Sequence, residues 1–289
     1  MNTGRVLNTG RVLSTGAGAG PNPGATGAAD PGSGPAADRE RAAAAIRADG
    51  TPEAEWARWE GWDAVRAAPR IDGPVVVVAA HPDDEVLGVG GTLARLTASG
   101  TDVHVVTVTD GEASHPGSRR VSPAALARLR ADELTAALDD LGVDRRRRTR
   151  LGVPDTRVDA YESEVAGHLA EVVRSSGARL CLAPWTGDLH ADHEAAGRAA
   201  RTAARVTGTP LWYYPVWMWH WAVPGDPRVP WGTVRRLPLT EAEQARKGAA
   251  VNRFRTQIAP LADDPGDPTV ILPPAELLHH RRAFEVILL

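Results

Sequence analysis

A histidine and three carboxylates follow a run of apolar residues in the segment VVVVAAHPDDEVLGVGG, which begins at Val75. His81, Asp83, Asp84 and Glu85 stand at the point where a buried strand is expected to end. Repulsion between neighbouring carboxylates disfavours their ionised forms. A bound cation would offset this repulsion, so the segment predicts a metal site.

A second group of candidate ligands lies in the segment HADH, at the expected start of a helix, where His190 and His193 are found. His81 and Asp84 are three residues apart at a strand-to-helix turn, so both side chains can face one point. Two histidines and one carboxylate with an open position are typical of catalytic zinc. The sequence therefore predicts one zinc ion per chain, or another divalent metal, with Asp83 beside it as a general base.

The glycines at positions 88, 90 and 91 do not indicate a dinucleotide-binding loop. Their spacing is GxGG rather than GxGxxG, and a pyrophosphate at this helix entry would meet the three preceding carboxylates. We expect these glycines to let the backbone turn tightly behind the site.

The elements that must position both motifs alternate along the chain, which predicts an α/β fold with a mostly parallel sheet and helices on both faces. Ligands bind at the carboxyl ends of the strands in such sheets, which is where the histidines and carboxylates gather. Strands are expected over residues 74–81, 101–110, 149–155, 178–185 and 210–219, and helices over residues 38–50, 51–69, 90–100, 122–142, 161–177, 190–208 and 240–258.

Residues 1–37 are expected to be a disordered tail, and residues 38–289 a single domain. The tail repeats NTGRVL and is rich in Gly, Ala and Pro, so it offers little apolar surface to bury.

The paired motifs AHPDDE and HADH resemble those of the LmbE-like, or PIG-L, N-acetylglucosaminyl deacetylases. The resemblance covers residues 74 to about 200 well. It implies a Rossmann-like fold with one zinc ion held by His81, Asp84 and His193. It also implies that Asp83 activates the metal-bound water and that His190 stabilises the oxyanion. Asp192 would orient one of the histidines from behind.

Further residues of this sequence match family positions that bind the sugar substrate. Glu112, Arg130 and Asp155 resemble family positions that contact the sugar, and Arg128 is an alternative to Arg130. Asp188 stands where the mycothiol-pathway member of the family has a tyrosine, so we count it among the candidate substrate contacts. This departure argues against a mycothiol-type substrate and leaves the metal chemistry unchanged.

Two other features have more than one interpretation. Five of the nine tryptophans lie between residues 212 and 231, either as core or as an aromatic wall beside the site. His279 and His280 are adjacent, so they point in different directions, and a solvated surface is the favoured interpretation.

The amino-acid composition argues against several classes of protein. A net charge of -3 over 289 residues does not suggest a nucleic-acid surface, and the one basic run, residues 145–148, is expected to be a solvated loop. The single cysteine excludes an internal disulfide, and no apolar run is long enough for a membrane span. We therefore expect a cytoplasmic protein whose partner is a small amino-sugar molecule, with the oligomeric state left open.

The predicted function is removal of an N-acetyl or other acyl group from an amino sugar or its conjugate. Alternatives are an amidase for a larger thiol or sugar conjugate and a metal-dependent sugar-binding protein without catalysis. Asp83 argues against the second alternative, because a binding site needs no base beside its metal ligands.

Overall fold

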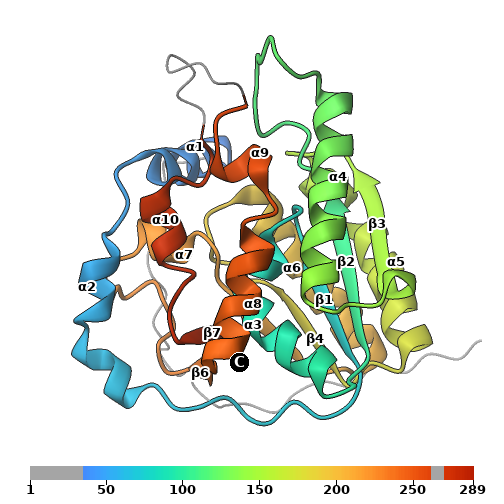
Figure 1. Cartoon of the computed structure of the whole chain (residues 1–289), viewed down its shortest axis with the longest axis vertical. Helices are drawn as coiled ribbons and strands as arrows, with labels where there is room; N and C mark the ends of the chain where they lie inside the picture. The colour runs from blue at the N-terminus through green and yellow to red at the C-terminus, as the bar shows by residue number, and fades with distance from the viewer. Residues whose placement is uncertain (1–34, 262–269) are drawn as a thin grey trace, which may run out of the picture. The chain divides into compact units, whose positions relative to one another are not determined.

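In residues 35–261 and 270–289, which this computed structural model describes, seven strands form one sheet in the order β3-β2-β1-β4-β5-β7-β6 (Figure 1). The strands are β1 (Val75–Ala79), β2 (Val103–Thr109), β3 (Arg148–Val153), β4 (Leu180–Pro184), β5 (Leu211–Tyr214), β6 (Val234–Pro238) and β7 (Phe284–Leu288). Strands β3, β2, β1, β4 and β5 are parallel, and β7 pairs antiparallel with both β5 and β6. The strand order reverses between β1 and β4, which is where this kind of sheet binds ligands.

Helices cover both faces of the sheet, which confirms the predicted α/β class (Figure 1). The α-helices are α1 (Pro35–Arg47), α2 (Glu53–Ala57), α3 (Asp84–Ala98), α4 (Pro123–Asp140), α5 (Glu162–Ser176), α6 (Ala191–Thr207), α7 (Met218–Trp221), α8 (Glu241–Val251), α9 (Arg255–Ile258) and α10 (Pro274–Leu278). The 3-10 helices are η1 (Glu60–Ala64), η2 (Arg145–Arg147) and η3 (Val158–Tyr161). None of the described helices is both long enough and apolar enough to cross a membrane.

Alternation along β1 explains the two apolar layers. Val75 and Val77 pack with side chains of α3, α4 and α8 on one face of the sheet. Val76 and Val78 pack with side chains of α5 and α6 on the other face. Because every residue of β1 is buried, the strand reads as a continuous apolar run rather than an alternating one.

The C-terminal third departs most from the prediction. The fifth strand ends at Tyr214 rather than continuing to residue 219, and the tryptophans that follow lie in a loop and in α7. Pro215 carries no amide hydrogen, and the amides of Val216 and Met218 donate to Asp188 instead of to a neighbouring strand. Strands β6 and β7 were not predicted.

The remaining boundaries lie close to the predicted ones, with three exceptions. The expected helix over residues 240–258 is divided into α8 and α9, because residues 252–254 between them are not helical. Helix α3 begins at Asp84, six residues before the expected start, so the acidic segment forms its first turn. The expected helix over residues 51–69 is only α2 and η1. Helix α1 begins at Pro35, three residues inside the predicted tail, and residues 1–34 lie outside the described residues.

Most of the tryptophans belong to the core. Trp56 and Trp62 of the N-terminal segment pack with Trp219 and Trp231, and the Trp59 and Trp231 ring centroids are 4.3 Å apart. His279 and His280 are also buried, so the prediction that they are solvated was wrong. His279 contacts the Glu53 carboxylate at 2.7 Å, and His280 Nδ1 lies 3.2 Å from the Leu87 carbonyl.

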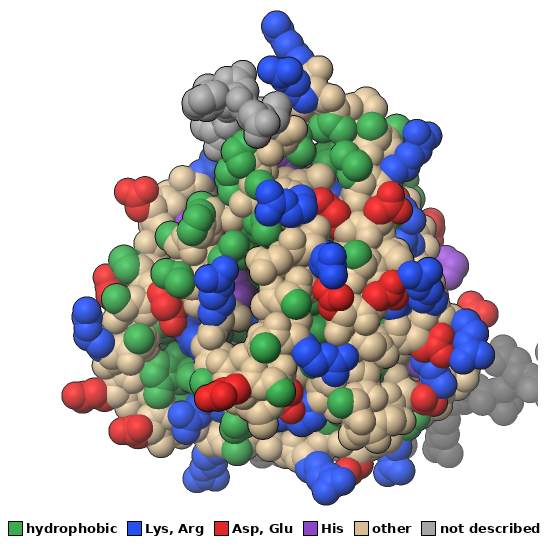
Figure 2. All heavy atoms as spheres, in the orientation of Figure 1, with side chains coloured by type: hydrophobic (Ala, Val, Ile, Leu, Met, Phe, Trp, Pro, Cys, Tyr) green, Lys and Arg blue, Asp and Glu red, His purple; other side chains and the backbone are tan. Residues whose placement is uncertain are grey.

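The surface over α4 and α8 carries acidic and basic side chains interspersed with each other (Figure 2). It shows no broad area of a single sign.

Candidate active site

His81 and Asp84 are placed by the end of β1 and the first turn of α3. Between them, Asp83 has a φ angle of +130°, a conformation that costs about 1–3 kcal/mol for residues other than glycine. The Arg130 guanidinium holds this turn, because it donates to Asp83 Oδ2 at 3.0 Å, to the Pro82 carbonyl at 2.7 Å and to the Gly111 carbonyl at 3.0 Å.

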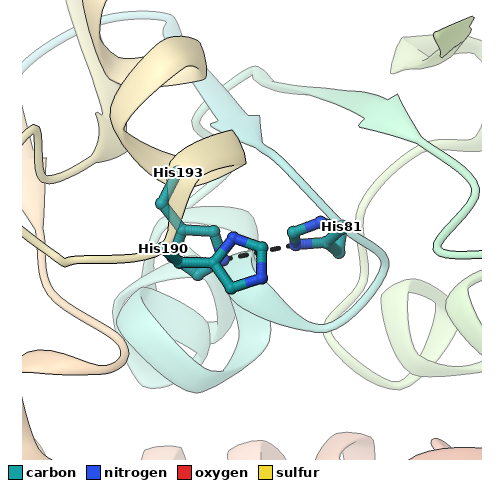
Figure 3. Close-up of side chains that lie close together, drawn as sticks. All are labelled: His81, His190 and His193. Atoms are coloured by element: carbon teal, nitrogen blue, oxygen red, sulfur yellow. Dashed lines mark hydrogen bonds between the residues drawn. The ribbon is translucent and has the colours of Figure 1, made fainter. Parts of the chain in front are cut away.

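His190 and His193 come from the start of α6, where His190 is the N-terminal cap residue. Leu189, immediately before it, has a φ angle of +62° and turns the chain into the helix. Both imidazoles then face the loop that carries His81 (Figure 3).

Three side chains meet at one point in the structure. His81 Nδ1 lies 3.2 Å from His193 Nε2. Asp84 Oδ1 lies 3.2 Å from His193 Nε2, and Asp84 Oδ2 lies 3.5 Å from His81 Nδ1. The His190 ring is adjacent, 4.5 Å from the His193 ring and 4.8 Å from the His81 ring between centroids.

The other nitrogen of each histidine faces a carboxylate behind the site. His81 Nε2 lies 3.2 Å from Asp155 Oδ1 and 3.3 Å from Asp192 Oδ2. His193 Nδ1 lies 2.7 Å from Asp188 Oδ2. Histidine ligands of metals are commonly held in this way, with the second ring N–H donated to a carboxylate.

These donors fit a metal ion. Nitrogens bound to a tetrahedral zinc ion at about 2.0–2.1 Å are roughly 3.3 Å apart, and His81 Nδ1 and His193 Nε2 are 3.2 Å apart. His81, His190 and His193 also lie close enough together to hold an ion as a set, as do His81, Asp155 and Asp192.

The electrostatics of the cluster formed by His81, Asp84, His190 and His193 favour a positive charge at the point where these side chains meet. Burial alone would lower the pKa of His193, but Asp84 and Asp188 raise it to about 9. Burial would also lower the pKa of His81. The carboxylates of Asp155, Asp192 and Asp84 outweigh this effect and raise the pKa of His81 well above its ordinary value. The same carboxylates would favour a divalent cation over these protons.

Asp83 and His190 have different environments. Burial raises the pKa of Asp83 to about 7, although the nearby Arg130 guanidinium lowers it. Burial, together with the charges of His193 and His81, holds the pKa of His190 well below its ordinary value, so this imidazole is neutral. Its Nδ1 atom is buried without a hydrogen-bond partner among the described residues.

A cavity of about 400 Å³ opens onto this cluster, within the usual range for small-molecule sites. Its polar side includes the cluster and Arg130, and its apolar side is the edge of the core formed around Leu87 and Val216. The apolar lining residues are Ile46, Leu87, Ala113, Val216, Trp217, Val270, Ile271 and Leu272. Trp217 thus belongs to a wall of the site, whereas Trp219 and Trp231 belong to the core.

The predicted substrate contacts divide into two groups. Arg130 and Asp155 line the cavity, although both also hold residues of the cluster. Glu112 is not among the described lining residues, and its carboxylate accepts the Asp155 amide at 2.9 Å. Asp188 is 0% exposed, so the prediction that it contacts substrate was wrong.

Asp188 instead holds His193 and the loop after β5. Its carboxylate also accepts the amides of Val216, Trp217 and Met218 at 2.9–3.3 Å. Asp192 lies behind His81, as the predicted orienting role requires, and also accepts the Thr156 and Val158 amides. The one signal for Asp188 was its position in GDLHADH, which does not reveal partners that are about thirty residues away.

Comparison with known proteins places the chain in a family. The family model described as GlcNAc-PI de-N-acetylase, PIG-L, matches residues 76–204. The 1D-myo-inositol 2-acetamido-2-deoxy-alpha-D-glucopyranoside deacetylase of Streptomyces avermitilis is 33% identical over 218 residues, covering 67% of this chain and 72% of the relative. The chain belongs to the PIG-L family.

Other PIG-L relatives match over shorter stretches. A deacetylase with the same name from Streptomyces griseus is 34% identical over 166 residues, which is 48% of this chain and 50% of the relative. The chain thus spans about half the length of this and several other curated relatives. The crystal structure of a conserved protein from Thermus thermophilus aligns with a TM-score of 0.50 and 30% identity, over 65% of this chain and 80% of that chain.

Proposed function

We propose that this PIG-L protein is a zinc-dependent hydrolase that removes an N-acetyl group, or another acyl group, from an amino sugar or amino-sugar conjugate. The observation that carries the proposal is the meeting of His81, Asp84 and His193 at one point, beside Asp83 and next to a cavity. The named activity of the Streptomyces relatives supports the choice of an N-acetylated glucosaminide.

His81 Nδ1, His193 Nε2 and the Asp84 carboxylate would hold the zinc ion, with Asp188 and Asp192 fixing the two rings. A zinc ion at this position would polarise the substrate carbonyl and make a water molecule more acidic. The three residues leave the cavity side open for substrate.

Asp83 is the proposed general base. Its carboxylate lines the cavity, and Arg130 holds one of its oxygens at 3.0 Å. Asp83 takes a proton from the attacking water, while the positive charge of Arg130 opposes the rise in the pKa of Asp83 caused by burial and orients the carboxylate.

His190 is proposed to stabilise the oxyanion formed from the amide carbonyl. It lines the same cavity, and its neutral ring carries one N–H that can be donated to the developing negative charge. The proton taken by Asp83 is then available for the leaving amine.

The first test is metal content and deacetylase turnover, with a panel of N-acetylated amino sugars, for the wild type and for Asp83→Asn. We expect one zinc ion in both proteins and a loss of kcat of about 10²–10⁴-fold in the variant. Asp132→Asn, on the exposed side of α4, is the matched control and should retain full turnover.

Two outcomes would point elsewhere. Zinc binding without turnover on any sugar, including large conjugates, would favour a sugar-binding protein. A wild type that takes up no metal when zinc is supplied would contradict the proposal itself.

A further inference from the structure

Helix α3 is interrupted one turn after Asp84, and a buried ion pair fills the interruption. Val89 has φ and ψ angles of −138° and 20°, which are not helical. Lys247 of α8 and Glu285 of β7 reach this point from distant parts of the chain, and each is 4% exposed. Their charged groups are 2.9 Å apart.

The ion pair satisfies the backbone groups on both sides of the kink. In an unbroken helix the Gly91 amide would donate to the Leu87 carbonyl. Here the Gly91 amide donates to Glu285 Oε1 at 2.7 Å, and the Leu87 carbonyl accepts from Lys247 Nζ at 2.7 Å. The Thr92 amide donates to the second Glu285 oxygen at 2.9 Å.

The glycines of the GxGG segment make room for this arrangement. A Cβ atom on Gly88 would lie 2.2 Å from Cδ2 of Tyr214, and one on Gly91 would lie 2.6 Å from Cδ1 of Leu239. A Cβ atom on Gly90 would lie 3.2 Å from Cγ of Lys247. The segment therefore serves close packing against β5, α8 and the turn that precedes α8, not a phosphate.

The turn before the kink belongs to the site. It carries Asp84 at its start, and the Leu87 side chain lines the cavity while the Leu87 carbonyl faces the ion pair. A helix that ran straight through Val89 would place this turn, and the Asp84 carboxylate with it, at a different angle to His81 and His193.

We infer that Lys247 and Glu285 are positioning residues that set the direction of the first turn of α3 and thereby aim Asp84 at the metal. The inference rests on the proposed metal site. Neither residue lines the catalytic cavity or contacts the cluster, so both act through the backbone of residues 87–92.

The test is zinc affinity, measured by competition with a chromophoric chelator, for the wild type and Glu285→Gln. The amide of the variant keeps one acceptor and loses the charge, so we expect zinc to bind about 10–100-fold more weakly. Hydrogen exchange at the Gly91 and Thr92 amides should accelerate in the same variant, with or without metal.

Glu53→Gln is the matched control, because Glu53 belongs to another, half-buried ion pair, and its carboxylate is hydrogen-bonded to Arg282 and His279 rather than to the backbone of α3. It should be less stable than the wild type and bind zinc normally. If Glu285→Gln behaves in the same way, with zinc affinity within about twofold of the wild type, the two residues are only structural and the inference is wrong.

Gly90→Ala provides a second variant should Glu285→Gln fail to fold. It keeps both charges and crowds the Lys247 side chain, so we expect a smaller, several-fold loss of zinc affinity. Unchanged affinity and unchanged exchange in this variant would also overturn the inference. A wild type without metal affinity would contradict the proposed function instead, and the exchange measurement would still test the kink.

Discussion

At the scale of single residues, Asp188 has the clearest expected effect outside the metal ligands. Asp188→Asn leaves His193 Nδ1 and three backbone amides facing a weaker acceptor in a fully buried position. We expect zinc to bind about 10–100-fold more weakly and the free energy of unfolding to fall by about 1–3 kcal/mol. Chelator competition and urea denaturation would measure the two effects.

The control for this variant is Asp226→Asn. Asp226 is also buried and accepts the Arg228 amide at 2.9 Å, but it lies away from the cluster. It should lose stability and keep its zinc affinity. Equal zinc affinity in both variants would show that Asp188 does not orient His193.

Trp217 should contribute to substrate binding rather than to chemistry. Trp217→Ala removes an aromatic wall of the cavity, so we expect KM to rise about tenfold and kcat to change little. Trp212→Ala is the control, since Trp212 packs on the core and is not among the described cavity residues. Steady-state kinetics on the best N-acetylated sugar would separate them, and an unchanged KM in Trp217→Ala would count against this wall.

The sequence predicted the residues that form the cluster better than it predicted the contacts of residues that lie behind or around it. His81 and Asp84 could be predicted because they follow a buried strand within a few residues, so the local sequence pattern determines where they lie. The partners of His279 and His280 lie far along the chain, at Glu53 and Leu87, and no local pattern reveals them. Asp188 was misassigned for the same reason.

At the scale of elements, close packing of α3 on β5 leads to a further prediction. Gly88→Ala would bring a methyl group against the Tyr214 ring, in a core where both groups are buried. We expect a loss of about 1–3 kcal/mol in the free energy of unfolding. Differential scanning calorimetry or urea denaturation would measure it.

Gly167→Ala is the matched control within α5. A Cβ atom there would meet nothing within 4 Å, and the residue is exposed. This variant should be more stable than the wild type by roughly 0.5–1 kcal/mol, because alanine favours the helix. A Gly88→Ala protein as stable as the wild type would show that α3 and β5 have room for the added methyl group.

Elements with complete local signals were predicted closely. Helix α4 has Ser122 as its cap and Pro123 at its first turn, as expected from the sequence. Strands β6 and β7 were missed because they pair antiparallel at the edge of a sheet whose other strands alternate with helices. Their segments are short and Pro-rich or terminal, and their partners are fixed only by tertiary packing.

At the scale of the whole molecule, Glu53 ties the N-terminal segment to the residues before β7. Burial would raise the pKa of Glu53, but hydrogen bonds from His279 and Arg282 outweigh it and hold the pKa below the ordinary 4.5. A carboxyl with a depressed folded pKa adds stability above its unfolded pKa and loses it as the pH falls through the folded value. The wild type should therefore exceed Glu53→Gln in stability at neutral pH, by a margin that shrinks below pH 4.5.

Urea denaturation of both proteins at several pH values would check this. A margin that stays constant on acidification would mean that the Glu53 carboxylate is not ionised in the folded protein.

The overall architecture was predictable because strands and helices of the first two hundred residues alternate regularly. The docking of residues 53–64 against the far end of the chain was not, since it depends on aromatic contacts between Trp56 or Trp62 and Trp219. Such contacts join segments about 160 residues apart and leave no periodic trace.

The tryptophan cluster has a practical consequence for spectroscopy. Trp56, Trp59, Trp62, Trp219 and Trp231 form a set of close, mostly tilted or edge-on ring pairs. Rings in such contact share their electronic transitions, so their circular dichroism should report docking of the N-terminal segment as one collective signal. Trp217 stands apart at the cavity. Its fluorescence should respond to a bound sugar while the emission of the cluster does not, which gives the protein separate optical reporters for folding and for ligand.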